Sequence, residues 1–219
     1  MTRSISEAKN MIVVAINRSW PLANGDIRKS GREYLFNPED HYFDHLIRAI
    51  QDSTELSPLS NESATQRLAE IMDEAYRAII RITALGCLDY VMLLTAFRLR
   101  QPTKSLTRAS DIIHQALDLT DILIGEAQFE RILRESSPYL SEYATKLIIA
   151  VSQSNLFSEL SPEQSRDKLV ETINKAAHQL RSAHLPLNAQ YLTSLTVDLL
   201  GCPTFNHSHD LIFLCLYDL

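Results

Sequence analysis

The stretch that decides the fold is residues 71–97, which read IMDEAYRAIIRITALGCLDYVMLLTAF. In its first half, apolar residues recur every three or four positions, which is the period of a helix with one buried face. After Gly86, nearly every residue up to Phe97 is apolar, which predicts a helix that is buried on all sides. We therefore expect this segment to form a buried central helix around which the other helices pack.

Glycine is scarce, with five residues in a chain of 219. Because glycine supplies the positive φ of hairpin turns and lets the backbone approach phosphate closely, its scarcity argues against β-hairpins and phosphate-binding loops. Helix-capping residues recur instead at Ser4, Asn37 and Ser161, the last two followed directly by proline. The sequence predicts an all-α fold, an irregular bundle of about seven to nine helices around residues 71–97.

Length and composition favour a single all-α domain over residues 1–219. No change in composition marks a boundary, and the polar loop at residues 53–61 is where one would fall. The net charge of −6 argues against a general nucleic-acid binder. Three irregularly spaced cysteines are typical of reduced thiols, which predicts a cytoplasmic protein. The longest apolar stretch, residues 84–97, contains Asp89 and is too short to cross a bilayer, so we expect no membrane partner.

Apolar and aromatic residues gather in two places that suggest contact with another chain. The C-terminal stretch LIFLCLYDL (residues 211–219) is strongly apolar, although chain ends are usually polar. Burial in the core is the commoner outcome for such a segment, and capture by a partner is the alternative. The loop from Trp20 to Phe36 is long enough to suggest a functional role. The candidate partner-binding residues are Trp20, Tyr34, Phe36, Leu211, Phe213, Leu216 and Tyr217.

Two basic loops, residues 28–32 and 98–108, stand out in this acidic chain. Such loops can contact phosphate groups or an acidic partner. Arginines at the end of a helix also complement the helix dipole, and no aromatic residue interleaves these cations as a base-stacking surface requires. The candidate phosphate or acidic-partner contacts are Arg98, Arg100, Lys104 and Arg108.

Three groups of residues resemble incomplete metal sites. They are the pair His41 and His45, the pair Asp111 and His114, and the C-terminal set Cys202, His207, His209 and Cys215. Each group lacks the further ligands or the spacing that zinc or di-iron sites need. We therefore assign no catalytic, cofactor-binding or metal-binding residue and expect no cofactor. The sequence leaves open whether His41, His45, His114, Cys202, His207 and His209 converge in space.

These observations favour a non-catalytic helical interaction or accessory subunit of a larger cytoplasmic assembly. Its partner would be another protein chain, in a hetero-complex or a homo-oligomer. The first alternative is a small helical enzyme or metalloprotein that uses histidine, cysteine and carboxylate groups. The second is an accessory protein that contacts nucleic acid through residues 28–32 and 98–108. An enzyme is the less favoured class because no local catalytic motif such as G-x-S-x-G is present.

Overall fold

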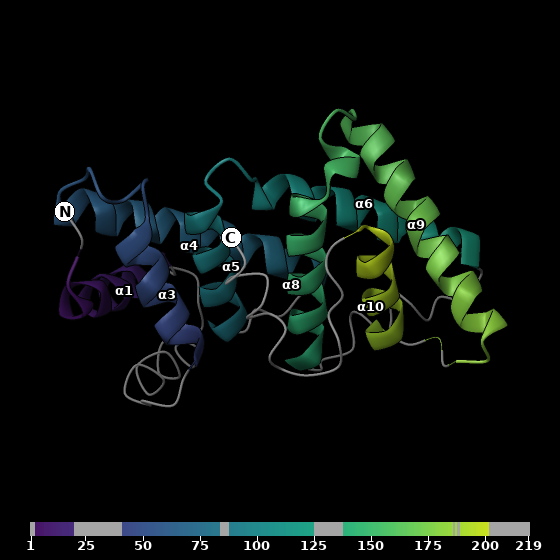
Figure 1. Ribbon diagram of the computed structural model, residues 1–219, viewed down its shortest axis with the longest axis horizontal. Helices are drawn as coiled ribbons and strands as arrows, with labels where there is room; N and C mark the ends of the chain where they lie inside the picture. Colours follow the sequence, from purple (N-terminus) through teal and green to yellow (C-terminus); the bar gives the residue numbers. More distant parts are fainter. Residues whose placement is uncertain are drawn as a thin grey trace. The chain divides into compact units, whose positions relative to one another are not determined.

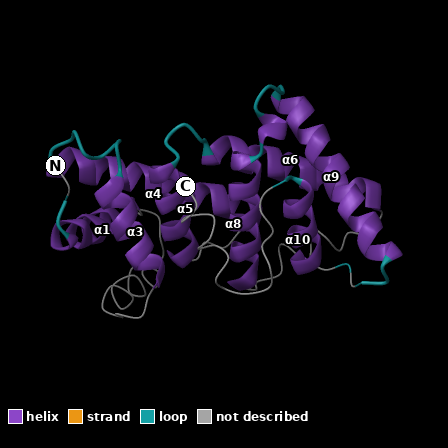
Figure 2. Ribbon diagram, in the orientation of Figure 1, coloured by secondary structure: helices purple, strands orange, loops and turns teal. Residues whose placement is uncertain are grey.

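The structure is a computed structural model that describes residues 3–19, 41–83, 88–124, 138–185, 187 and 189–201. Within these residues it contains eight α-helices, one short 3-10 helix and no strand (Figures 1 and 2). The predicted all-α fold is therefore confirmed. None of the described helices is both long and apolar enough to cross a membrane.

The chain forms two compact units, one of residues 1–77 and 86–105 and the other of residues 78–85 and 106–219. Unit 1 holds α1 (Ile5–Ser19), α3 (His41–Asp52), most of α4 (Asn61–Thr83) and α5 (Leu88–Arg100). Unit 2 holds the last residues of α4, α6 (Leu106–Ile124), α8 (Pro138–Gln153), η1 (Asn155–Phe157), α9 (Pro162–Ser182) and α10 (Ala189–Leu199). The loop at residues 53–61 lies inside unit 1, and the single domain expected from the sequence stays a prediction.

In unit 1, α5 is buried on almost every side, as its composition predicts. Nine of its residues are buried: Leu88, Val91, Met92, Leu93, Leu94, Thr95, Ala96, Phe97 and Leu99. Helix α3 packs against it and runs in the same direction. The Tyr42 ring near the start of α3 lies 6.1 Å from the Tyr90 ring near the start of α5, and Glu55 beyond the end of α3 reaches Arg98 near the end of α5. Helix α1 covers α3 in turn.

Within residues 71–97, the structure describes the end of α4 and most of α5. Helix α4 ends at Thr83, α5 begins at Leu88, and residues 84–87 lie outside the described part of the chain. Gly86, at which the sequence allows a kink or a break, is among these undescribed residues. The predicted burial nevertheless holds for both helices, including Ile71, Met72 and Ile79 of α4.

In unit 2, α6 packs against both α8 and α9, and α10 also packs against those two helices. Helix α9 begins as predicted, at a capping box in which Ser161 and Gln164 bind each other's backbone N–H groups. Helix α8 is a second deeply buried helix, with the five consecutive residues 147–151 all buried. At the start of the unit, Arg81 of α4 pairs with Asp111 of α6 at 2.9 Å.

An ion-pair network fastens the end of α5 to the rest of unit 1. Glu55 accepts hydrogen bonds from Arg67 Nε at 2.6 Å and from Arg98 Nη1 at 3.1 Å, using a different carboxylate oxygen for each. The Arg98 side chain is only 11% exposed, and Glu74 is its second carboxylate neighbour at 3.8 Å. Hydrogen bonding to Glu70 and then to Glu55 raises the pKa of Arg67 above its ordinary value. Glu55 thus joins α4 to α5 through one shared carboxylate.

We expect Glu55→Gln to lower the free energy of unfolding of unit 1 by about 1–3 kcal/mol. The variant leaves Arg98, which is mostly buried, with only the more distant carboxylate of Glu74. The cost falls below that of a fully buried pair because the Glu55 side chain is 21% exposed. Urea unfolding followed by circular dichroism measures the difference.

The matched control is Glu70→Gln, which removes an acid that binds the same Arg67 but whose side chain is 50% exposed. Exposed pairs contribute little, so this variant should change the stability by less than about 0.5 kcal/mol. Equal losses in the two variants would show that Arg98 does not depend on Glu55.

Candidate partner-binding surface

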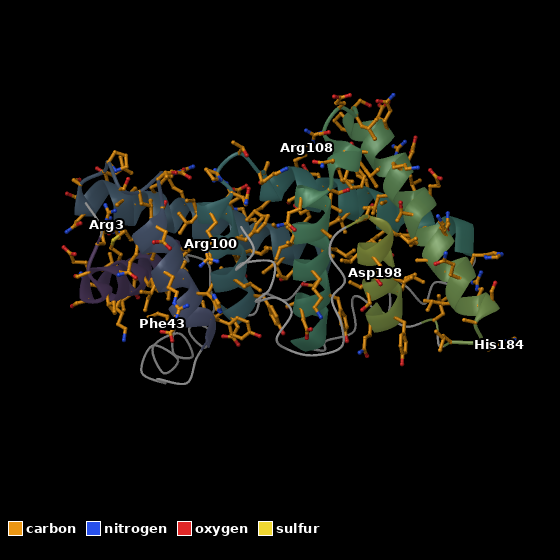
Figure 3. All side chains as sticks on the ribbon, in the orientation of Figure 1. Arg3, Phe43, Arg100, Arg108, His184 and Asp198 are labelled. Carbon is orange, nitrogen blue, oxygen red and sulfur yellow. The ribbon has the colours of Figure 1, made fainter. Side chains whose placement is uncertain are left out.

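The start of the described chain is fastened into unit 1 through Arg3, which is buried (Figure 3). Its Nη2 donates a hydrogen bond to the Leu59 carbonyl oxygen at 2.9 Å. Its own carbonyl oxygen accepts a hydrogen bond from Gln51 Nε2 at 3.0 Å. The entry to α1 is therefore tied to the end of α3 and to the loop before α4. We call residues 3–7, Gln51 and residues 57–61 the Arg3 corner.

A capping box orders the first turn of α1 within this corner. Ser4 N and Ser4 Oγ both donate to Glu7 Oε2, at 2.8 and 2.9 Å, and Glu7 N donates to Ser4 Oγ at 3.2 Å. These hydrogen bonds from Ser4, helped by the Asn61 side chain and the charge of Arg3, lower the pKa of Glu7 below its ordinary value. Asn61, one of these groups, is the first residue of α4.

The corner leaves apolar side chains at the surface. Ile5 lies on the same helical face as Ala8, Ile12 and Ile16, at spacings of three, four and four residues. Those three residues are at most 4% exposed, whereas Ile5 is 57% exposed. Leu59, whose carbonyl oxygen binds Arg3, is 36% exposed. The apolar face of α1 therefore extends beyond the part that unit 1 covers.

The partner-binding residues that the sequence suggests are not part of this corner. Trp20, Tyr34, Phe36, Leu211, Phe213, Leu216 and Tyr217 all lie outside the described residues, and so does the basic loop at residues 28–32. Their roles stay predictions. Sequence reasoning also missed the Arg3 corner, although Ile5 is in phase with the buried residues of α1 and its position signals an extended apolar face.

The second basic loop is divided between the two units. Arg98 belongs to the ion-pair network of unit 1, and the partly buried Arg100 and Lys104 lie in the same unit. In unit 2, Arg108 Nη2 donates to the carbonyl oxygens of Phe157 and Leu160 at 3.2 and 3.0 Å. Two of the four candidate phosphate contacts therefore hold their own unit together, and nucleic-acid contact by this loop stays a prediction.

The described members of the histidine groups have separate surroundings. His45 is 4% exposed on the buried face of α3, in unit 1. His114, in unit 2, places Nδ1 3.2 Å from Asp118 Oδ2, while Asp111 pairs with Arg81. The side chain of His41 and all of Cys202, His207, His209 and Cys215 lie outside the described residues. Among the residues that are described, no three histidine, cysteine or carboxylate side chains group as metal ligands would.

Comparisons with known protein families, characterised proteins and solved structures found no match.

We expect the pKa of the Glu7 carboxyl to rise toward its ordinary value in Ser4→Ala, because the Ser4 hydroxyl then no longer binds it. Since the pKa is lowered on folding, the stability that this carboxylate contributes is present above the ordinary glutamate pKa. It is lost as the pH falls through the lowered value. A titration of the side-chain carboxyl by nuclear magnetic resonance measures the change.

Ser6→Ala is the control, since Ser6 is exposed on the same turn of α1 and is not among the groups that lower the pKa of Glu7. It should leave the titration of Glu7 unchanged. A Glu7 titration that is the same in Ser4→Ala as in the native protein would contradict the capping geometry.

Proposed function

We propose that this protein is a non-catalytic interaction subunit of a larger cytoplasmic assembly and that the Arg3 corner is one of its docking surfaces. The observation that supports this proposal is the exposed end of the apolar face of α1 at Ile5, two residues after Arg3, which binds the carbonyl oxygen of the exposed Leu59. The partner is another protein chain, which covers these side chains with apolar groups of its own.

The hydrogen bonds that hold the corner favour a docking role over a chance exposure of apolar side chains. Single exposed apolar side chains are common on monomeric proteins. Ile5 and Leu59, however, lie on two segments that are joined at Arg3. A surface that is already held in place loses little conformational entropy when a partner binds, so even a small apolar contact can contribute to affinity.

The rim of the corner indicates the chemistry of the partner. The exposed residues around the two apolar side chains are mainly hydroxyl-bearing or acidic: Ser4, Ser6, Glu7, Ser57, Ser60 and Glu62. A polar rim around an apolar centre is the usual composition of a protein interface. We infer that the partner presents an apolar side chain surrounded by hydrogen-bond donors.

The metalloprotein and nucleic-acid alternatives remain predictions that no described residue favours. Among their candidates, Cys202 and residues 28–32 lie outside the described part of the chain, and Arg98, Arg108 and His114 bind neighbours in their own unit.

We expect the double variant Ile5→Ser/Leu59→Ser to lose at least about tenfold in affinity for the partner, because it replaces both apolar groups of the corner by hydroxyls. The partner is first captured with the tagged full chain from its native host, after nuclease treatment and washes at moderate and high salt. It is then purified, and the dissociation constants of the native and variant chains are compared.

The control is Leu156→Ser/Leu185→Ser, which removes two apolar side chains of unit 2 that are 43% and 47% exposed. This control should bind as the native chain does, and circular dichroism should show unchanged helix content in both double variants. Recovery of the chain alone at both salt concentrations would refute the subunit proposal. Equal loss in the two double variants would refute the corner as the docking surface.

A further inference from the structure

Helix α10 carries threonine at the centre of its buried face. Thr193 and Thr196 are 2% and 1% exposed, and they lie among Leu192, Val197 and Leu200, which are also buried. This face packs against α8 and α9. The positions that anchor a short helix are usually aliphatic, so the two hydroxyl groups at this interface require an explanation.

Neither hydroxyl of α10 has a protein hydrogen-bond partner within the described residues. Several buried threonines in other helices do have one, since their hydroxyls donate to the carbonyl oxygen four residues earlier. Examples are Thr95 to Val91 at 2.7 Å and Thr172 to Lys168 at 2.8 Å. A buried hydroxyl without a partner costs more than one that is paired. The docking of α10 is therefore weaker than its buried area suggests.

The helices against which α10 packs also contain buried hydroxyl groups without a hydrogen-bond partner within the described residues. Thr145 of α8 and Ser165 of α9 are both fully buried, and neither hydroxyl finds a partner in the described part of the chain. One side-chain hydrogen bond does join the ends of the two helices, from Ser154 Oγ to the Leu200 carbonyl oxygen at 3.0 Å. Because Ser154 follows α8 and Leu200 follows α10, the two helices end on the same side and run parallel, as Figure 1 shows.

The two ends of α10 are suited to movement. The helix has 11 residues, too few to be stable in water without neighbours. On its N-terminal side, His184 has a φ of 56°, a left-handed conformation that side chains rarely adopt (Figure 3). On its C-terminal side, Gly201 has a φ of 73° and no atom within 4 Å of the position that a Cβ would take. Gly201 follows α10 closely, whereas His184 ends α9, where its N–H donates to the Arg181 carbonyl oxygen at 3.1 Å.

We propose that α10 is a releasable helix that detaches as one element from α8 and α9 while the rest of unit 2 stays folded. The remaining helices can stay together because α6 packs against both α8 and α9 without α10. The consequence for binding rests on the proposed function. Residues 211–217 follow α10 in the sequence, so release would lengthen the reach of that apolar segment toward a partner.

Hydrogen exchange of the full chain, measured by mass spectrometry without any partner, tests the release. The backbone amides in the last two turns of α10 should exchange at least about tenfold faster than those in the middle of α9. The double variant Thr193→Val/Thr196→Val should slow exchange in α10 roughly fivefold or more, since methyl groups replace the unpaired hydroxyls. Ser154→Ala should accelerate it by about twofold to fivefold, since the hydrogen bond to Leu200 is lost.

The matched control is Thr172→Val, which removes a buried hydroxyl that is hydrogen-bonded within α9. In this variant, the amides of α10 should still exchange faster than the amides in the middle of α9 do in the native chain. Equal protection of α10 and α9 in the native chain would overturn the proposal. So would faster exchange in Thr193→Val/Thr196→Val, which would show that water or another group satisfies those hydroxyls. Because the measurement needs no partner, failure of the proposed function would not alter its outcome.

Discussion

The need to bury α5 on every side governs the packing of unit 1. A helix without a polar stripe cannot lie at the surface, so its neighbours must cover its whole circumference. The same neighbours cover the side chain of Arg98, near the C-terminal end of α5, which is only 11% exposed. A guanidinium in that position needs a carboxylate, and Glu55 reaches it because α3 runs parallel to α5. The ion-pair network is thus a consequence of apolar burial rather than an independent source of stability.

The buried faces of the helices could be predicted because their signal is local. Leu169, Ile173, Ala176 and Leu180 of α9 recur at helical spacing, and all four are buried. The pair of Arg98 with Glu55 could not be predicted, since 43 residues separate the two in sequence and only tertiary packing brings them together. Sequence reasoning made Arg98 a candidate phosphate or acidic-partner contact, with the helix dipole as the alternative, and neither interpretation identifies Glu55 as its partner.

The depth of burial was harder to predict than its direction. Residues 147–151 of α8 read LIIAV and are all buried, yet a short apolar run does not reveal whether a helix is covered on one side or on all sides. Ile5 is the opposite case, since it continues the apolar face of α1 and yet remains 57% exposed. Periodicity identifies a face, but it does not indicate where the neighbouring helices end. Nothing in the loop sequence around Leu59 signals its bond to Arg3.

Threonine shows why equal burial does not imply equal stability. Thr95 of α5 satisfies its hydroxyl on the carbonyl oxygen of Val91, so it can lie in the core at little cost. Thr196 of α10 is buried to the same degree without such a bond within the described residues. Such differences set the local stability, and the elements that move are those with a low free energy of local opening. The Arg3 corner, which several hydrogen bonds hold in place, and α10, whose two buried threonine hydroxyls lack a partner within the described residues, therefore suit different tasks. The corner can present a preformed surface, while α10 can change its position at a modest cost in free energy.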